Sequence, residues 1–157
     1  MNAVIAANGS ASFLLGASGG NATGCDWSRP RFLEVKAYQW ATSTNGVLRV
    51  MLGGKPWSWA IGAMSHHGIG FEIRNTRLWI TAHNGTAGVS QDTGIDVVTA
   101  NAAATYRVTN DGLGNVNLYR NGIQIGSTLQ GGPRVNTNNA CNVIYEVICG
   151  GDITATT

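Results

Sequence analysis

The sequence predicts an all-β domain, built either as a sandwich of two antiparallel sheets or as a barrel. Charged residues make up only 11% of the chain, and the 22 glycines are joined by many Asn, Thr and Ser residues. This composition favours short strands and tight turns over helices. Several short stretches alternate apolar and polar residues, which is the period of a strand with one buried face. A hairpin signature between Ala104 and Gly126 is the third observation.

The N-terminal segment, residues 1–30, is predicted to supply an edge strand around Ala11–Leu15 and then a long loop through Gly16–Pro30. An alternative is an extended arm, since such a segment can add a strand to a neighbour's sheet. The first residues make a poor signal peptide, because they lack a positive start and Asn8-Gly9-Ser10 interrupts the apolar part. We therefore expect assembly in a cytoplasm, or export by another route, with the protein finally on a virion surface or outside the cell.

Five further strands are predicted from alternation, with the core sandwich at residues 31–149 of a single domain that spans 1–157. They are Arg31–Trp40, Val47–Leu52, Ile69–Arg74, Arg77–Ala82 and Asn142–Cys149. A tight turn at Asn75-Thr76 joins the third to the fourth. The last strand carries bulky residues on both faces, which predicts burial on both sides.

The hairpin centres on Asn121-Gly122, a dipeptide that takes positive φ at both positions, as a type I′ turn requires. An earlier turn is predicted at Asn110-Asp111-Gly112. The face predicted to be buried comprises Val116, Leu118, Ile123 and Ile125. The opposite, polar face comprises Asn115, Asn117, Tyr119 and Gln124.

These pieces resemble the concanavalin A-like, laminin G-like jelly roll. The matching segments are Gly68–Ile73, Arg77–Ile80, Thr105–Val108 and Asn115–Gly126, and the resemblance covers roughly Arg31–Ile148. It implies two packed antiparallel sheets, one of them concave, with loops at the rim. Members include lectins, carbohydrate-binding modules, adhesion domains, glycanases, and phage virion and appendage domains, so the fold does not fix the function.

Catalysis is not expected, and no catalytic residue is assigned. Glycan-cleaving relatives need two carboxylates converging on the glycosidic bond. The glutamates of this chain are Glu34, Glu72 and Glu146, and their neighbours two positions on are Lys36, Arg74 and Ile148. No predicted strand therefore presents two carboxylates on one face, and the alternation of acid and base favours a solvated face with weak ion pairs.

Tryptophans supply the first candidates for ligand binding. Trp79 lies on the polar face of its predicted strand with Arg77, so we expect an exposed ring for stacking or for subunit packing. Trp57 and Trp59 share one face of a strand and would make a stacking platform, unless they point into the core.

Loop polar groups supply the second set of candidates, namely His66, His67, His83 and Asn84, which are expected in turns. Loop side chains can hydrogen-bond sugar hydroxyls, although the same residues are also ordinary turn polars. No metal is assigned: Asp92, Asp96 and Asp111 offer oxygens for calcium, but calcium needs six to eight. We interpret these three as turn formers, and we expect no cofactor.

The three cysteines do not form a zinc motif. Cys141 and Cys149 lie about 26 Å apart on one predicted strand, so either could pair only with Cys25. We expect reduced thiols, and the sequence leaves their redox state open.

The sequence favours a non-enzymatic binding module on a phage virion or appendage surface, recognising a glycan or host receptor. One alternative is a purely structural capsid decoration or fibre subunit. A homo-oligomer is expected for the binding module and for the structural subunit alike. A second alternative is a glycan-cleaving enzyme. The net charge of +2 is scattered along the chain, and no apolar stretch reaches about 20 residues. We therefore expect neither nucleic-acid binding nor membrane insertion.

Overall fold

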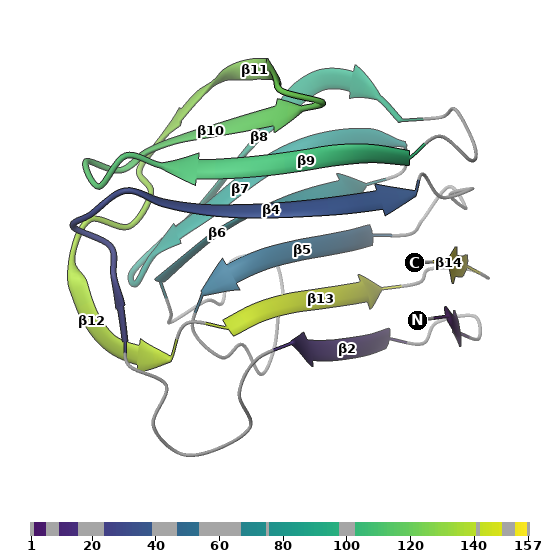
Figure 1. The fold of residues 1–157 in the computed structure, drawn as a ribbon, viewed down its shortest axis with the longest axis horizontal. Coiled ribbons are helices and arrows are strands. Elements are labelled where there is room, and N and C mark those ends of the chain that lie inside the picture. The colour runs from purple at the N-terminus through teal and green to yellow at the C-terminus, as the bar shows by residue number, and fades with distance from the viewer. Residues whose placement is uncertain are drawn as a thin grey trace.

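The computed structural model describes most of the chain. Its backbone covers residues 2–5, 10–15, 24–38, 47–53, 67–74, 76–97, 103–140, 142–148 and 153–156, and its side chains cover 26–36, 49–53, 67–74, 76–97 and 104–135. Every regular element in these ranges is a β-strand (Figure 1). No helix long and apolar enough to cross a membrane is found in the described part.

Two antiparallel sheets form the body of the molecule. The four-stranded sheet has the order β11 (Ile123–Gln130), β10 (Asn115–Arg120), β9 (Ala103–Asn110) and β4 (Arg31–Tyr38). The six-stranded sheet has the order β2 (Ser10–Leu15), β13 (Asn142–Ile148), β5 (Val47–Gly53), β6 (His67–Arg74), β7 (Arg77–Asn84) and β8 (Gly88–Asp96). Figure 1 shows the four-stranded sheet in front of β6, β7 and β8.

Two short ladders complete the described backbone. β12 (Asn136–Ala140) pairs with β3 (Gly24–Asp26), and β1 (Asn2–Ile5) pairs with β14 (Ile153–Thr156). The second ladder brings the two ends of the chain together, at the right of Figure 1.

The core lies between the two main sheets and consists of the inward residues of both. The Phe71 ring on β6 stacks on the Tyr106 ring on β9, with centroids 4.9 Å apart and an interplanar angle of 24°. Such offset stacking adds to the free energy of apolar burial. The other fully buried apolar side chains include Trp27, Ile69, Ile73, Leu78, Ile80, Val97 and Leu118. The predicted two-sheet sandwich is therefore confirmed.

The predicted hairpin is also confirmed in its turn chemistry. Asn121 has φ 51° and Gly122 has φ 82°, so both adopt the positive φ of a type I′ turn. The Asn121 N–H donates to the carbonyl of Thr105 at 2.8 Å, and the Thr105 N–H donates to Asn121 Oδ1 at 2.9 Å. These two bonds attach the hairpin tip to β9.

Three local predictions were wrong. Ile123, expected on the buried face, is 71% exposed because it stands at the hairpin tip opposite Arg120, beyond the core. Asp92 and Asp96, expected in a turn, lie in strand β8, where the ladder to β7 is irregular and Gly94 takes φ 79°. The loop predicted through Gly16–Pro30 contains β3.

Some expectations lie outside the described residues. Cys25 falls in β3, but its side chain is not described, and Cys141 and Cys149 lie outside the described ranges. The side chains of β13, which were predicted to be buried on both faces, are also not described. The thiol state and that burial stay predictions.

Candidate functional site

The outer face of the six-stranded sheet carries a buried ionic cluster. Arg49 Nε lies 2.7 Å from Glu72 Oε1, and Arg74 Nε lies 2.5 Å from Glu72 Oε2. The Arg49 and Glu72 side chains are only 4% and 3% exposed. The prediction of a solvated face is therefore wrong for Glu72. Because both carboxylate oxygens are held by guanidinium groups and shielded from solvent, Glu72 is not placed to meet a substrate.

Trp79 lies on this same face, as predicted, but it is half-buried rather than exposed. The Arg74 guanidinium stacks over its ring, 4.6 Å from the centroid, as in a cation–π pair. The indole N–H is buried and makes no hydrogen bond within the described part of the chain. The ring therefore packs against its own protein.

Arg77 is held by two carboxylates of β8. Its Nη2 atom lies 3.0 Å from Asp92 Oδ2, and its Nη1 atom lies 3.5 Å from Asp96 Oδ2. The N–H of Gly94 donates to Asp92, and this bond and the Arg77 guanidinium hold the pKa of Asp92 below its usual range. Asp92 and Asp96 are thus compensated by Arg77. Among the described residues, no three His, Cys, Asp or Glu side chains converge as a metal site would require.

Three candidates expected in turns lie in strands instead, because the ladder between β6 and β7 extends past their apolar runs: His67 begins β6, and His83 and Asn84 end β7. His83 is 1% exposed, and its Nδ1 accepts a hydrogen bond from the N–H of Gly85 at 3.1 Å. Asn84 Oδ1 accepts from the N–H groups of Thr86 and Ala87 at 3.0 and 2.9 Å. His67 is half-buried at the start of β6.

Among the described residues, the sequence-predicted candidates do not come together in one open site. Asp111 stays in the predicted turn, where it accepts from the N–H groups of Leu113 and Asn115. Trp57, Trp59 and His66 lie outside the described residues.

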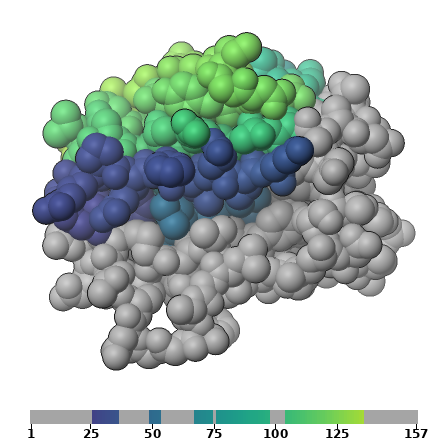
Figure 2. Space-filling model, in the orientation of Figure 1, coloured from purple at the N-terminus to yellow at the C-terminus, as the bar shows by residue number. Residues whose placement is uncertain are grey.

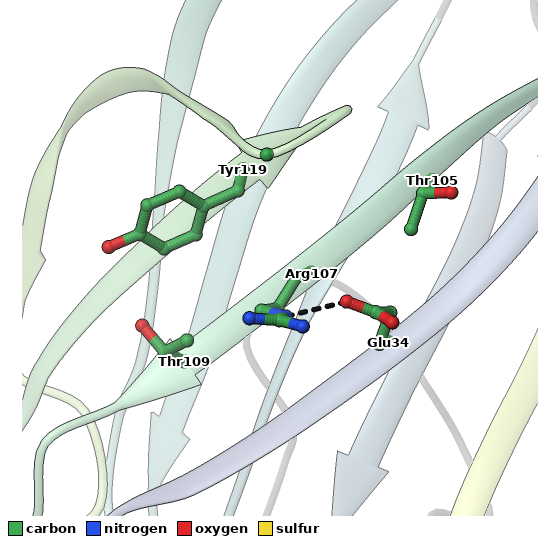
Figure 3. Close-up of a pocket in the computed structure, with 6 residues that line it drawn as sticks. Glu34, Thr105, Arg107, Thr109 and Tyr119 are labelled. Carbon is green, nitrogen blue, oxygen red and sulfur yellow. Dashed lines mark hydrogen bonds and ion pairs between the residues drawn. The ribbon is translucent and has the colours of Figure 1, made fainter.

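A hollow of about 350 Å³ opens instead on the outer face of the four-stranded sheet. It is lined by Glu34, Thr105, Arg107, Thr109, Tyr119 and Gly122. This sheet forms part of the molecular face in Figure 2, with β4 in blue beside β9, β10 and β11 in green. Figure 3 shows the lining side chains rising from β4, β9 and β10.

Strand alternation and register place these groups together. Arg107 on β9 lies opposite Glu34 on one side and opposite Tyr119 on the other. Directly opposite residues share one face of a sheet, so the three side chains form a row across the strands. Thr105 and Thr109 lie two positions away on β9 and share the same face. The hairpin tip closes one end, where Gly122 joins the lining.

An ion pair forms the floor of the hollow. Arg107 Nε lies 2.6 Å from Glu34 Oε2, and the side chains are 51% and 40% exposed (Figure 3). A surface pair of this kind adds little to stability. It does present carboxylate oxygens and guanidinium N–H groups side by side, which can accept from and donate to the same ligand.

Unused hydroxyl groups surround this pair. The side-chain hydroxyls of Tyr119, Thr105 and Thr109 make no hydrogen bond within the described part of the chain, whereas both carboxylate oxygens of Glu72 on the other sheet are bonded. The Tyr119 ring is half-buried and adds an apolar surface beside the ion pair. The hollow therefore brings an aromatic ring close to hydrogen-bond donors and acceptors.

Sequence reasoning missed this group. Alternation did assign Tyr119 to the outward face, and an outward aromatic residue among asparagines was the available signal. The partner Glu34 is 73 residues away from Arg107 in the chain, so only the strand order brings them together.

Comparisons with solved structures show the fold. A glycoside hydrolase family 16 endo-glucanase from Bacteroides ovatus has 12% identity and a TM-score of 0.52 over 82% of this chain and 58% of that chain. The carbohydrate recognition domain of Emp46p, in its potassium-bound form, has 13% identity and a TM-score of 0.54 over 98% of this chain and 78% of that domain. The botulinum neurotoxin serotype D binding domain has 10% identity and a TM-score of 0.52 over 96% of this chain and 37% of that chain.

These similarities define the architecture as a concanavalin A-like jelly roll, which confirms the resemblance found in the sequence. No protein-family model matches the chain, and no curated protein matches its sequence. The chain spans little more than half of the glucanase. Because the fold serves both a glycoside hydrolase and a carbohydrate recognition domain, it is compatible with either cutting or holding a glycan.

Proposed function

We propose that the protein is a carbohydrate-binding module and that the hollow on the four-stranded sheet is its binding site. The observation that carries this proposal is the grouping of the Tyr119 ring, the Arg107–Glu34 pair and two threonine hydroxyls that bond no other described residue. The apolar face of a sugar ring would pack on Tyr119. Its hydroxyls would donate to Glu34 and accept from Arg107, as such polar groups commonly orient ligands.

The same geometry favours binding without cleavage. Glycoside hydrolysis needs two carboxyl groups, about 5–5.5 Å apart in retaining enzymes and wider in inverting ones. Among the described residues that line the hollow, Glu34 is the single carboxylate, and it is paired with Arg107. We therefore propose a module that holds its glycan intact.

The biological setting is a further part of the proposal. A binding module on a phage virion or appendage surface, recognising a glycan or a host receptor, fits the family resemblance of the sequence. In that setting the hollow would face outward from the particle. Other virion proteins, or further copies of this chain, would contact surfaces away from it.

A glycan array followed by titration calorimetry tests the function. Wild-type protein should bind at least one class of neutral glycan, and Tyr119→Ala should weaken that binding about tenfold or more, equivalent to about 1.4 kcal/mol. Thr86→Ala is the matched control, because Thr86 is exposed in the turn between β7 and β8, remote from the hollow. A reducing-sugar assay on the bound glycan should show no release.

Two results would overturn the proposal. The first is an array on which no glycan binds. The second is glycan binding that Tyr119→Ala leaves at the wild-type affinity, because the site would then lie elsewhere. Release of sugar, lost in Glu34→Gln, would replace the binding module with an enzyme.

A further inference from the structure

A second aromatic ring lies on the same outer face as Tyr119. Phe32, on the edge strand β4, is 64% exposed, so its ring is open to solvent. The Arg107 guanidinium lies 5.6 Å from its ring centroid. Because the same guanidinium also pairs with Glu34, Phe32 is joined through Arg107 to the floor of the hollow.

Register fixes how Phe32 and Tyr119 are spaced. Phe32 lies opposite Thr109, and Thr109 lies opposite Asn117, which is two positions before Tyr119 on β10. The two aromatic residues are thus separated by two strand spacings and by two residues along the strand. With about 4.8 Å per spacing and about 3.4 Å per residue, their Cα atoms are about 12 Å apart on the diagonal.

Polar groups occupy the path between the two rings. The diagonal crosses β9 between Arg107 and Thr109, so a ligand lying along it would pass a guanidinium and an unused hydroxyl. Glu34 and Arg107 cancel each other's charge, which leaves this path suited to neutral, hydroxyl-rich chemistry. An aromatic surface at each end and hydrogen-bonding groups between them match a chain of sugars.

We propose that the site takes an extended neutral oligosaccharide that crosses the strands from Tyr119 to Phe32. This inference rests on the proposed function and specifies its ligand. Because about 12 Å separates the two Cα atoms, a ligand that stacks on both rings has to be longer than one sugar, and a short sugar chain meets that requirement. One sugar stacks on Tyr119 within the hollow, and a later sugar of the same chain stacks on Phe32.

The dependence of affinity on chain length tests the inference. Calorimetry would compare cello-, laminari-, malto- and chito-oligosaccharides, each from the monosaccharide to the hexasaccharide. For the series that binds, wild-type affinity should rise about tenfold or more with length and then reach a plateau. Phe32→Ala should remove that gain and leave the affinity for the shortest ligand unchanged, whereas Tyr119→Ala should weaken every member.

Two further variants make the test specific. Phe32→Tyr keeps an aromatic ring and should retain the gain with length. Val135→Ala removes an apolar side chain that is 51% exposed outside the two main sheets, and it should behave as wild type. Circular dichroism should show the same strand signal for all variants.

The possible results distinguish failure of the extended site from failure of the proposed glycan-binding function. Equal affinity for short and long ligands, with Phe32→Ala unchanged, would overturn the extended site and leave a single-sugar module. No binding in any series or on the array would overturn both. If Phe32→Ala instead converts an oligomer to a monomer in light scattering, and leaves glycan affinity intact, Phe32 is a contact between copies and the inference fails.

Discussion

Replacing Glu72 with glutamine should destabilise the fold far more than the same change at Glu34. Both glutamates pair with an arginine, but Arg49 and Glu72 are 4% and 3% exposed, whereas Arg107 and Glu34 are 51% and 40% exposed. Glu72→Gln keeps the shape of the side chain and removes its charge. The buried guanidinium of Arg49 and the partly buried one of Arg74 then lose their shared anion.

The expected magnitude follows from this burial. Removing one partner of a buried ion pair costs about 3–5 kcal/mol. We take the lower end, about 3 kcal/mol, because glutamine retains one oxygen acceptor. That is a large part of a domain stability of about 5–15 kcal/mol, and it corresponds to a fall in Tm of about 6–12 °C. For the exposed pair, Glu34→Gln should cost less than about 1 kcal/mol.

Urea unfolding measures both variants under one set of conditions. Tryptophan fluorescence and far-ultraviolet circular dichroism should give coincident transitions, with a lower midpoint for Glu72→Gln and an unchanged slope. Added salt should alter the Glu34→Gln difference more than the Glu72→Gln difference, because exposed charges are screened more. The reasoning fails if the two variants lose the same stability.

Three other changes test local features. Gly70→Ala would place a Cβ 2.3 Å from the Val50 carbonyl oxygen, so it should lower the urea midpoint. Asn121→Ala puts a β-carbon at φ 51° and removes a hydrogen-bond acceptor, which should cost about 1–3 kcal/mol, whereas Asn121→Gly should cost less. Asp92→Asn should flatten the acid side of the stability profile. The Gly94 N–H holds the folded-state pKa of Asp92 below 3.8, so its contribution is present above that value and lost as pH falls through the folded pKa. Urea midpoints from about pH 5 to about pH 2 measure this.

Local chemistry explains which strands could be predicted. Asn121-Gly122 specifies its hairpin because few dipeptides take two positive φ angles, and the structure has that turn. β8 was missed because Gly88–Asp96 is rich in Gly, Asp, Ser and Thr, which have weak or turn-forming preferences. β8 is held as a strand by bonds to β7, such as Thr93 Oγ1 donating to the Leu78 carbonyl at 2.8 Å, and such bonds between strands are not encoded in the local sequence.

Alternation assigned side chains to faces, but it did not show which outward face is buried. Trp79 and Tyr119 were both placed on outward faces, and both are there. Arg74 covers the first ring, while the second lines an open hollow. That difference depends on the packing of distant segments, which the period of two along a strand does not encode.

Among the described residues, the two sheets differ in how far their outward polar groups are already hydrogen-bonded. On the six-stranded sheet, Glu72 binds two guanidinium groups and Arg77 bridges two carboxylates, so these groups are already matched within the chain. On the four-stranded sheet, the hydroxyls of Tyr119 and Thr109 bond no other described residue and lie beside an ion pair with no net charge. A group that is already paired and buried gains little from a ligand, because binding would first break its existing bonds. Partly exposed hydroxyls that bond no other described residue would lose only water to a ligand, which is why we propose the binding site on the four-stranded sheet.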